Sequence, residues 1–270
     1  MRVDLLPLSC WSRINIVMDL KENLLLAIEA AKNAGQIILQ GYSAQNTIDI
    51  KENKSQVTEI DKNSEKVIIQ TLEAGSNYKI LAEETRSEIG EEAIYWAVDP
   101  LDGTTNFIRR IPLCGVSIAL IKDGQPVIGV MFNPILNELF TAIKGEGAFL
   151  NEAKISCSEE SGIVFANSGY NSEHKEKFAQ IVAATTNYSV RKFGSTAYEL
   201  ACVARGSADA FVAWGDELWD HAAGILLVLE AGGIVNDWNK KEWSSHSNYV
   251  CASNKVIQDD LQVIIASVIN

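Results

Sequence analysis

The sequence has 270 residues, a length that predicts one large domain or two closely joined ones. Hydrophobic residues make up 47% of it and charged residues 21%, an ordinary globular composition that argues against a disordered or fibrous chain. The 35 acidic residues outnumber the 23 basic ones, and the net charge of −12 argues against a nucleic-acid partner, because binding to a phosphate backbone needs a basic face.

The cysteines and the N-terminal segment indicate the compartment. Five cysteines occur without a Cys-x-x-Cys pair: Cys10, Cys114, Cys157, Cys202 and Cys251. This odd, widely spaced set fits neither a disulfide framework nor a zinc cage, so we expect reduced thiols that pack in the interior. Residues 1–17 lack a clear cleavage site and are interpreted as an N-terminal extension. Because no apolar run approaches the ~18 residues of a membrane span, we expect a cytoplasmic protein without a membrane segment.

Two helices are predicted at the start of the chain. Apolar residues recur at helical spacing from Leu20 onward, and Gly41 is placed to cap this helix. A second helix opens at Thr58, where Asp61 three positions later completes the pattern of a capping box. This helix is predicted to continue to about Gly75.

Short strands follow the two helices. They are predicted at 79–82, 95–98, 116–121, 127–132 and 139–143. Asp123-Gly124 lies between two of them and predicts a hairpin. Gly145-Glu146-Gly147 precedes an apolar segment rather than a helix, so we expect a turn there and not a phosphate cradle.

Beyond Asn151 the pattern changes to strands that alternate with helices. Strands are predicted at 163–166, 188–191, 208–213 and 234–235. Helices are predicted near 172–185, 197–205, 219–231 and 256–268, and glycines end the second and third of these. The sequence therefore predicts a mixed α and β fold in two halves, 18–150 and 151–270, that meet near residue 150.

The most informative segment runs from Trp96 to Phe107. A buried strand ends in Asp99, Pro100 turns the chain, and Asp102 emerges three residues after Asp99. Two carboxylates so close together repel each other unless a cation lies between them. The residues after Asp102 would begin a helical turn whose N–H groups bind anions. The segment thus predicts a metal site beside a phosphate site, although such a motif taken alone is more often a surface turn.

Other acids lie at similar places in the predicted elements. Glu83 and Glu84 follow the apolar strand that ends at Ala82, and Asp220 stands at the start of an apolar helix. Taken alone, Asp220 has the place of an ordinary helix cap. Several acids at element ends favour a shared metal site over separate caps.

These residues carry a resemblance to a known family. The stretch from Trp96 to Arg109 and the stretch from Trp219 to Gly233 resemble the two signatures of the inositol monophosphatase family. The segments 57–61 and 82–85 fit the family too, so the resemblance covers roughly 19–270. It implies a layered αβαβα sandwich of the sugar-phosphatase type, usually a homodimer. It also implies Mg²⁺-dependent, lithium-sensitive hydrolysis of a small phosphorylated metabolite.

The resemblance also assigns roles to single residues. Glu83, Asp99 and the backbone carbonyl of Leu101 correspond to ligands of a first Mg²⁺, and Asp99 joins Asp102 and Asp220 around a second. Carboxylate and carbonyl oxygens are the ligands that Mg²⁺ prefers.

Catalytic and substrate contacts follow from the same resemblance. Glu83 and Thr104 would hold the attacking water, and Asp61 would orient Thr104, although Asp61 could instead serve only as a helix cap. The residues expected to contact substrate are Asp102, Gly103, Thr104, Gly194, Ser195, Thr196 and Asp220. The C-terminal half would therefore complete a site built mainly on the N-terminal half.

The substrate itself stays open. Inositol 1-phosphate is the first candidate, but family members that act on it commonly carry a carboxylate six residues before the Trp-Asp pair, and Ala213 stands there. Asp216 and Glu217 are nearby but out of register and could fill that role. Alternatives within the family are fructose 1,6-bisphosphate, histidinol phosphate and nucleotide 3′-phosphates.

An alternative of another class is a non-catalytic partner of the transcription machinery. The clustered acids favour the enzyme, because without a metal they cost folding energy.

The three histidines form neither a zinc set nor a hydrolase triad. His221 follows Asp220 directly, yet neighbouring helix positions face different directions, so we expect it to be a packing residue. Trp214, Trp219, Trp238 and Trp243 are expected in the core or at its rim.

Overall fold

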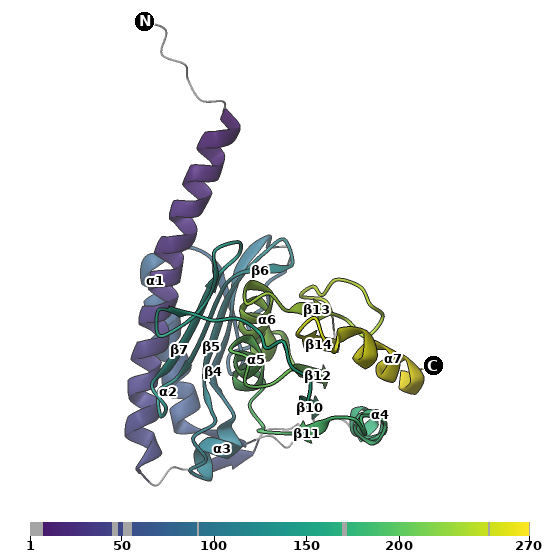
Figure 1. The fold of residues 1–270 in the computed structure, drawn as a ribbon. Coiled ribbons are helices and arrows are strands. Elements are labelled where there is room, and N and C mark those ends of the chain that lie inside the picture. Colours follow the sequence, from purple (N-terminus) through teal and green to yellow (C-terminus); the bar gives the residue numbers. More distant parts are fainter. Residues whose placement is uncertain are drawn as a thin grey trace, which may run out of the picture.

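Layers of helix and sheet alternate through the molecule (Figure 1). The computed structural model describes residues 8–44, 48–50, 56–90, 92–168, 172–247 and 249–269. One helix pair covers a seven-stranded sheet, a second pair lies between this sheet and a five-stranded one, and a third pair covers the outer face of the second sheet. This arrangement confirms the predicted αβαβα sandwich.

The first layer consists of α1 (Leu8–Tyr42) and α2 (Glu59–Gly75). Small side chains at helical spacing let α1 approach the sheet closely: Ala27, Ala30, Ala31 and Ala34 are all fully buried. The helix begins at Leu8 and not near Met18, so part of the segment interpreted as an extension is helical.

Both helix ends that the sequence singled out can be checked. Thr58 caps α2 as predicted, because its hydroxyl accepts the N–H of Ile60 at 3.2 Å and Asp61 accepts the N–H of Thr58 at 2.8 Å. The prediction for Gly41 was wrong, since this glycine lies inside α1. A Cβ there would come within 2.6 Å of the Ile60 side chain, so the glycine is needed where α1 crosses the start of α2.

The seven-stranded sheet runs in chain order, with its first pair parallel and the others antiparallel. Its strands are β3 (Lys79–Ala82), β4 (Ile94–Asp102), β5 (Gly115–Lys122), β6 (Gln125–Asn133), β7 (Glu138–Ile143), β8 (Gly147–Leu150) and β9 (Ala153–Lys154). The predicted hairpin at Asp123-Gly124 joins β5 to β6, and the predicted turn at Gly145 joins β7 to β8. A short antiparallel pair, β1 (Ile48–Ile50) and β2 (Gln56–Thr58), was not predicted.

The C-terminal half contributes the remaining layers. The five-stranded sheet has the order β11-β10-β12-β14-β13. Its strands are β10 (Ile163–Ser168), β11 (Ser189–Arg191), β12 (Ala210–Trp214), β13 (Ile234–Asn236) and β14 (Tyr249–Ser253). The helices are α4 (Ser172–Ala184), α5 (Thr196–Ala204), α6 (Leu218–Glu230) and α7 (Gln258–Ile269). Strand β14 and the short strands β8 and β9 were not predicted, whereas the other elements of this half lie close to their predicted ranges.

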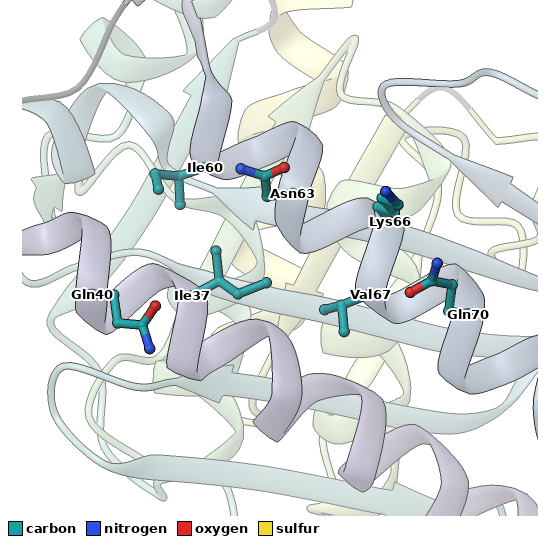
Figure 2. Close-up of a pocket in the computed structure, with 7 residues that line it drawn as sticks. All are labelled: Ile37, Gln40, Ile60, Asn63, Lys66, Val67 and Gln70. Carbon is teal, nitrogen blue, oxygen red and sulfur yellow. The ribbon is translucent and has the colours of Figure 1, made fainter.

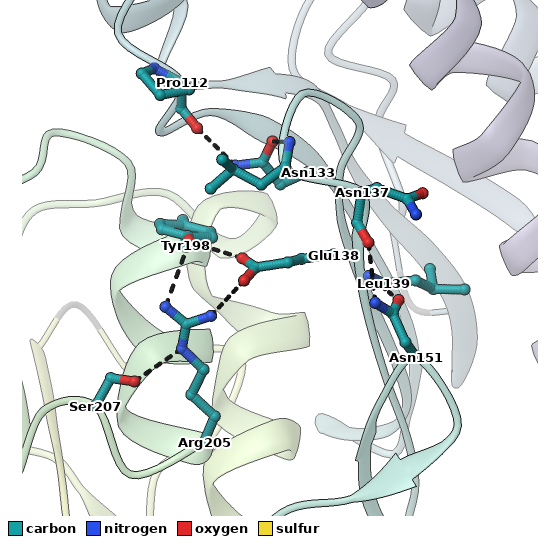
Figure 3. Close-up of polar contacts among 10 residues, drawn as sticks. Pro112, Asn133, Asn137, Glu138, Leu139, Asn151, Tyr198, Arg205 and Ser207 are labelled. Atoms are coloured by element: carbon teal, nitrogen blue, oxygen red, sulfur yellow. Dashed lines mark hydrogen bonds and ion pairs between the residues drawn. The ribbon is translucent and has the colours of Figure 1, made fainter.

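Contacts across residue 150 join the two halves. The core between the sheets combines Ala97 and Ala119 of the first half with Leu200 and Leu226 of the second. At its rim, Arg205 lies 2.6 Å from Glu138 of β7, and the Tyr198 hydroxyl donates to the same carboxylate at 2.7 Å (Figure 3). Helices α5 and α6 are therefore held against the first sheet.

The cysteine and membrane expectations can be compared with the described residues. Cys114, Cys202 and Cys251 are buried free thiols, and Cys157 is a half-buried one, as predicted. The side chain of Cys10 lies outside the described part of the structure. Within that part, none of the helices has the length and apolarity needed to cross a membrane.

Candidate active site

Strand β4 carries the first two acids of the site. It pairs with β5 up to Asp99, then its register shifts before it pairs again at Asp102. Asp99 is buried, with 2% of its surface exposed, and its Oδ1 accepts the N–H of Leu101 at 2.9 Å. The register shift therefore places Asp99, Leu101 and Asp102 together at the end of β4.

Asp102 links β4 to the start of α5. Its Oδ2 accepts the Ser195 hydroxyl at 2.7 Å and the N–H of Ala197 at 2.6 Å. Asp102 thus supplies the anionic cap for a helix whose own N-cap, Ser195, makes no side-chain capping bond. The structure brings the predicted substrate contacts at 194–196 beside the predicted metal acids.

Asp220 makes the helix-capping contact that the sequence offered as one of its two roles. It lies in the first turn of α6, and its Oδ2 accepts the N–H of Glu217 at 2.8 Å, which is a capping contact. Among the described residues, no protein donor bonds the second oxygen of Asp99, Asp102 or Asp220. Each of the three acids therefore accepts a backbone N–H with one oxygen, and their role as metal ligands stays a prediction.

Asp61 also combines two predicted roles. Besides capping α2, its Oδ1 accepts the Thr104 hydroxyl at 2.8 Å. The same hydroxyl lies 3.1 Å from the carbonyl oxygen of Leu101. Thr104 is the first residue of α3 (Thr104–Ile108), so Asp61 orients a side chain directly after Asp102 and Gly103.

Gly103 holds a conformation that another residue would adopt only with strain. Its φ of 85° lies in the left-handed region, and a Cβ would come within 3.0 Å of the Leu113 carbonyl and 3.1 Å of the Ser195 Cβ. No side chain caps α3, which starts immediately after it. The phosphate contacts expected from the backbone of Gly103 and Thr104 stay a prediction.

The acids interact strongly. Burial raises the pKa of Asp99 well above its usual range, and the charges of Glu83, Asp102 and Asp220 raise it further. Burial raises the pKa of Asp220 in the same way, followed by the charges of Asp216, Asp102 and Glu83. Burial also raises the pKa of Asp102 to about 7 and that of Asp61 to about 6. The structure therefore gathers the four predicted carboxylate ligands into one electrostatic cluster.

This donor set fits Mg²⁺. Four carboxylates and the Leu101 carbonyl are hard oxygen donors. Burial and neighbouring charges raise the pKa of Asp99, Asp102 and Asp220, so a bound cation would stabilise their charged forms. Within the described residues, no three acidic, histidine or cysteine side chains form a preassembled metal cage.

The loop before α5 depends on two residues that the sequence analysis missed. Asn106 donates to the carbonyls of Leu113 and Phe193, each at 2.7 Å. Glu199, fully buried, accepts the N–H groups of Phe193 and Gly194. The N–H of Gly194 is therefore already used inside the protein. The position of Asn106 inside the first signature was the only available signal.

The position of Ala213 explains the missing carboxylate. Ala213 is 1% exposed and belongs to the core between the two sheets, so a glutamate there would bring a charge into apolar surroundings. Asp216 lies instead beside predicted substrate contacts. Its Oδ2 accepts the Thr196 hydroxyl at 2.7 Å and the Asn167 amide at 3.5 Å.

The remaining candidates have structural roles. His221 is 2% exposed and meets the Trp243 ring edge-on, and burial lowers its pKa to about 3, so it is a packing residue as expected. The four tryptophans are buried, as predicted. A hollow of about 350 Å³ between α1 and α2 lies outside the acidic site (Figure 2). It is lined by Ile37, Gln40, Ile60, Asn63, Lys66, Val67 and Gln70.

Known proteins match almost the whole chain. The model of the inositol monophosphatase family matches residues 19–269. Inositol monophosphatase 2 of Solanum lycopersicum is 40% identical over 256 residues, which cover 87% of this chain and 94% of that protein. The Nus factor SuhB of Xylella fastidiosa is 36% identical over 258 residues, which cover 90% and 94%.

A solved structure agrees with the sequence matches. The extragenic suppressor protein suhB from Bartonella henselae superposes with a TM-score of 0.82 at 33% identity, covering 93% of this chain and 98% of that one. Sequence, fold and the acids at the ends of β4 and the start of α6 lead to one conclusion. The chain belongs to the inositol monophosphatase family and is a phosphoric monoester hydrolase.

Proposed function

We propose that the protein hydrolyses inositol 1-phosphate, or a similar small phosphate monoester, with Mg²⁺ as its cofactor. One observation carries the proposal: Asp99, Asp102 and Asp220 each accept a backbone N–H through one oxygen, and burial together with neighbouring acidic charges raises the pKa of each. Acids held in this way are ready to accept a cation, because charge neutralisation relieves their repulsion. We also propose a cytoplasmic, lithium-sensitive homodimer, as the family resemblance implies.

Different residues of the chain have different roles in the proposed reaction. Glu83, Asp99 and the Leu101 carbonyl would hold one Mg²⁺, and Asp99, Asp102 and Asp220 a second. When bound, Mg²⁺ supplies charge neutralisation at the phosphoryl oxygens and lowers the pKa of a coordinated water. Glu83 and Thr104 hold the attacking water, and Asp61 fixes the Thr104 hydroxyl through its 2.8 Å bond. The backbone of Gly103 and Thr104 holds the phosphate.

A direct assay tests this proposal. Phosphate release from inositol 1-phosphate, fructose 1,6-bisphosphate, histidinol phosphate and a nucleotide 3′-phosphate would be compared with Mg²⁺ and with EDTA. Inositol 1-phosphate is expected to give the highest kcat/KM, and EDTA to abolish turnover. Higher kcat/KM for another substrate would reassign the substrate, and full activity in EDTA would contradict the cofactor.

We expect Asp216 to select the substrate. A carboxylate that accepts a hydrogen bond from a sugar hydroxyl contributes about 1.5 to 3 kcal/mol, roughly a ten- to hundredfold preference. Asp216→Ala should therefore lower kcat/KM for inositol 1-phosphate by that factor relative to glycerol 2-phosphate. The control is Glu159→Ala, an exposed acid outside the candidate site. Equal losses on both substrates would contradict a role in selectivity.

The raised pKa values predict how Mg²⁺ stabilises the protein at different pH. In the folded state the pKa of Asp61 is about 6 and that of Asp102 about 7, against 3.8 when unfolded. Their contribution to stability is present at low pH and is lost between about pH 4 and pH 7 as the folded carboxyls ionise. Mg²⁺ binds the ionised forms, so it should raise Tm more at about pH 8 than at about pH 5.

Thermal unfolding with EDTA and with Mg²⁺ at the two pH values measures this difference. Asp99→Asn serves as the control, because it should abolish the Mg²⁺ increment at either pH. An equal increment at both pH values would show that the cation binds elsewhere.

A second function is favoured by the relatives named Nus factor SuhB. We infer from these names an alternative function, in which the chain binds transcription proteins instead of hydrolysing a phosphate ester. A pull-down with the purified, Mg²⁺-loaded protein tests the alternative. Absence of phosphate release from every monoester, together with stable capture of transcription proteins, would favour it.

A further inference from the structure

One face of α2 carries two buried acids a single turn apart. Asp61 is 1% exposed and bonds the Thr104 hydroxyl. Glu65, four residues on and therefore on the same face, is 2% exposed, and its Oε2 accepts the N–H of Glu84 at 2.7 Å. The helix thus touches both segments that carry the residues assigned to the attacking water.

The loop that carries Glu83 is fixed at three places. The N–H of Glu83 donates to the Val98 carbonyl at 3.1 Å, which ties the loop to β4. The N–H of Arg86 donates to the Ala82 carbonyl at 2.9 Å and closes a turn. Glu65 holds the middle of this turn through Glu84. Burial raises the pKa of the Glu65 carboxyl, and hydrogen bonding from Glu84 and Thr85 lowers it. Glu65 thus connects the turn to α2.

A carboxylate suits this place better than a neutral amide. The N–H of Glu84 and the hydroxyl and N–H of Thr85 are all donors, and a carboxylate accepts at both oxygens. A glutamine would present its NH₂ group to one of these donors. A buried charge beside Glu84 is costly, so the donor set accounts for an acid at this position.

We propose that Glu65 is a positioning residue that sets Glu83 relative to Thr104. Asp61 fixes Thr104 and Glu65 fixes the turn after Glu83, so α2 serves as a common support for both. Glu65 acts through the backbone of Glu84 and touches neither substrate nor metal. The assignment rests on the proposed function, in which Glu83 holds water and Mg²⁺.

Glu65→Gln removes one acceptor at nearly constant volume. A hollow of about 380 Å³ adjoins Glu65 and Thr85, so the variant does not overpack the core. We expect faster hydrogen exchange at the Glu84 amide, about tenfold weaker Mg²⁺ binding by calorimetry, and at least tenfold lower kcat with inositol 1-phosphate. A tenfold change corresponds to about 1.4 kcal/mol. KM should stay unchanged, because Glu65 does not contact substrate.

Two further variants separate the hydrogen bond from other effects. Glu73→Gln changes an exposed acid on the same helix and should match the wild type in every measurement. Glu65→Asp keeps the charge but falls one methylene short of the Glu84 amide, so it should behave like Glu65→Gln. If Glu65→Gln does not fold, Glu65→Asp alone tests whether Glu65 positions the turn after Glu83.

Three results would overturn the inference. The first is wild-type Mg²⁺ affinity and kcat in folded Glu65→Gln. The second is wild-type Mg²⁺ affinity and kcat in Glu65→Asp. The third is an unchanged rate of hydrogen exchange at the Glu84 amide in both variants. Failure of the proposed function is recognised separately, because the wild type would then release no phosphate. In that case hydrogen exchange at the Glu84 amide and calorimetric Mg²⁺ binding would still decide whether Glu65 positions the turn after Glu83.

Discussion

Asp99→Asn is expected to lower kcat by about a thousandfold, which corresponds to roughly 4 kcal/mol of transition-state stabilisation. Asp99 is the acid assigned to both metal positions, so its replacement removes a charge from each. The fold should survive, because an asparagine oxygen can still accept the N–H of Leu101. Phosphate release at saturating Mg²⁺, together with calorimetric titration of Mg²⁺, measures both expected losses.

The stability of the same variant provides an independent check. In EDTA its Tm should equal or exceed that of the wild type, because the substitution removes a buried charge that Glu83, Asp102 and Asp220 repel. Asp220→Asn should behave similarly, since its amide oxygen can still accept the N–H of Glu217.

Asp123→Asn is the matched control for both substitutions. Asp123 is exposed in the β5–β6 hairpin at a φ of 51°, which asparagine tolerates equally well. Near wild-type turnover in Asp99→Asn would refute the metal assignment, as would loss of turnover in Asp123→Asn at unchanged Tm.

Thr104→Val is expected to lower kcat by about a hundredfold or more, the usual contribution of a group that positions a proton donor or acceptor. Valine keeps the shape of the side chain but removes the hydroxyl that bonds Asp61 at 2.8 Å and lies 3.1 Å from the Leu101 carbonyl. Mg²⁺ affinity should change little, because the hydroxyl is not an assigned ligand.

A double-mutant cycle with Asp61→Asn tests how the two residues cooperate. If Asp61 acts through Thr104, the double variant should have nearly the kcat of Thr104→Val alone. Asp61→Asn should also destabilise the protein by about 1 kcal/mol, because it weakens the cap of α2.

Thr71→Val in α2 serves as the control for Thr104→Val, since the Thr71 hydroxyl donates to the Val67 carbonyl at 2.8 Å and accepts the Asn33 amide at 3.4 Å, both away from the acidic site. Kinetic losses that simply add in the double variant would show that Asp61 and Thr104 act separately.

Much of the fold could be predicted from features that involve only residues close together in the sequence. The capping box at Thr58, the hairpin at Asp123-Gly124 and the strand ending in Asp99 depend on residues a few positions apart. Such short-range features act in the same way whatever the rest of the chain does. The sequence therefore determined the order of most elements, the acids of the candidate site and, through two long motifs, the family.

Other features depended on residues that are far apart in the chain. The bond between Asp102 and Ser195 spans 93 positions, and the bond between Asp61 and Thr104 spans 43. No local pattern records such pairs, because they exist only after helices and sheets have packed. The same holds for Glu65, which reads as an ordinary helical acid until the Glu84 turn lies against it.

Packing also determined the roles of the residues whose interpretation from the sequence was wrong or open. Gly41 resembled a helix cap but allows a close helix crossing, and Ala213 belongs to the core while Asp216 lies beside Thr196. A residue's spacing in the sequence indicates which helix or strand it belongs to, whereas the neighbours that surround it determine its role. The sequence by itself thus determined which chemical groups form the site, and only the tertiary structure decided which atoms hold them in place, because burial and long-range hydrogen bonds arise on packing.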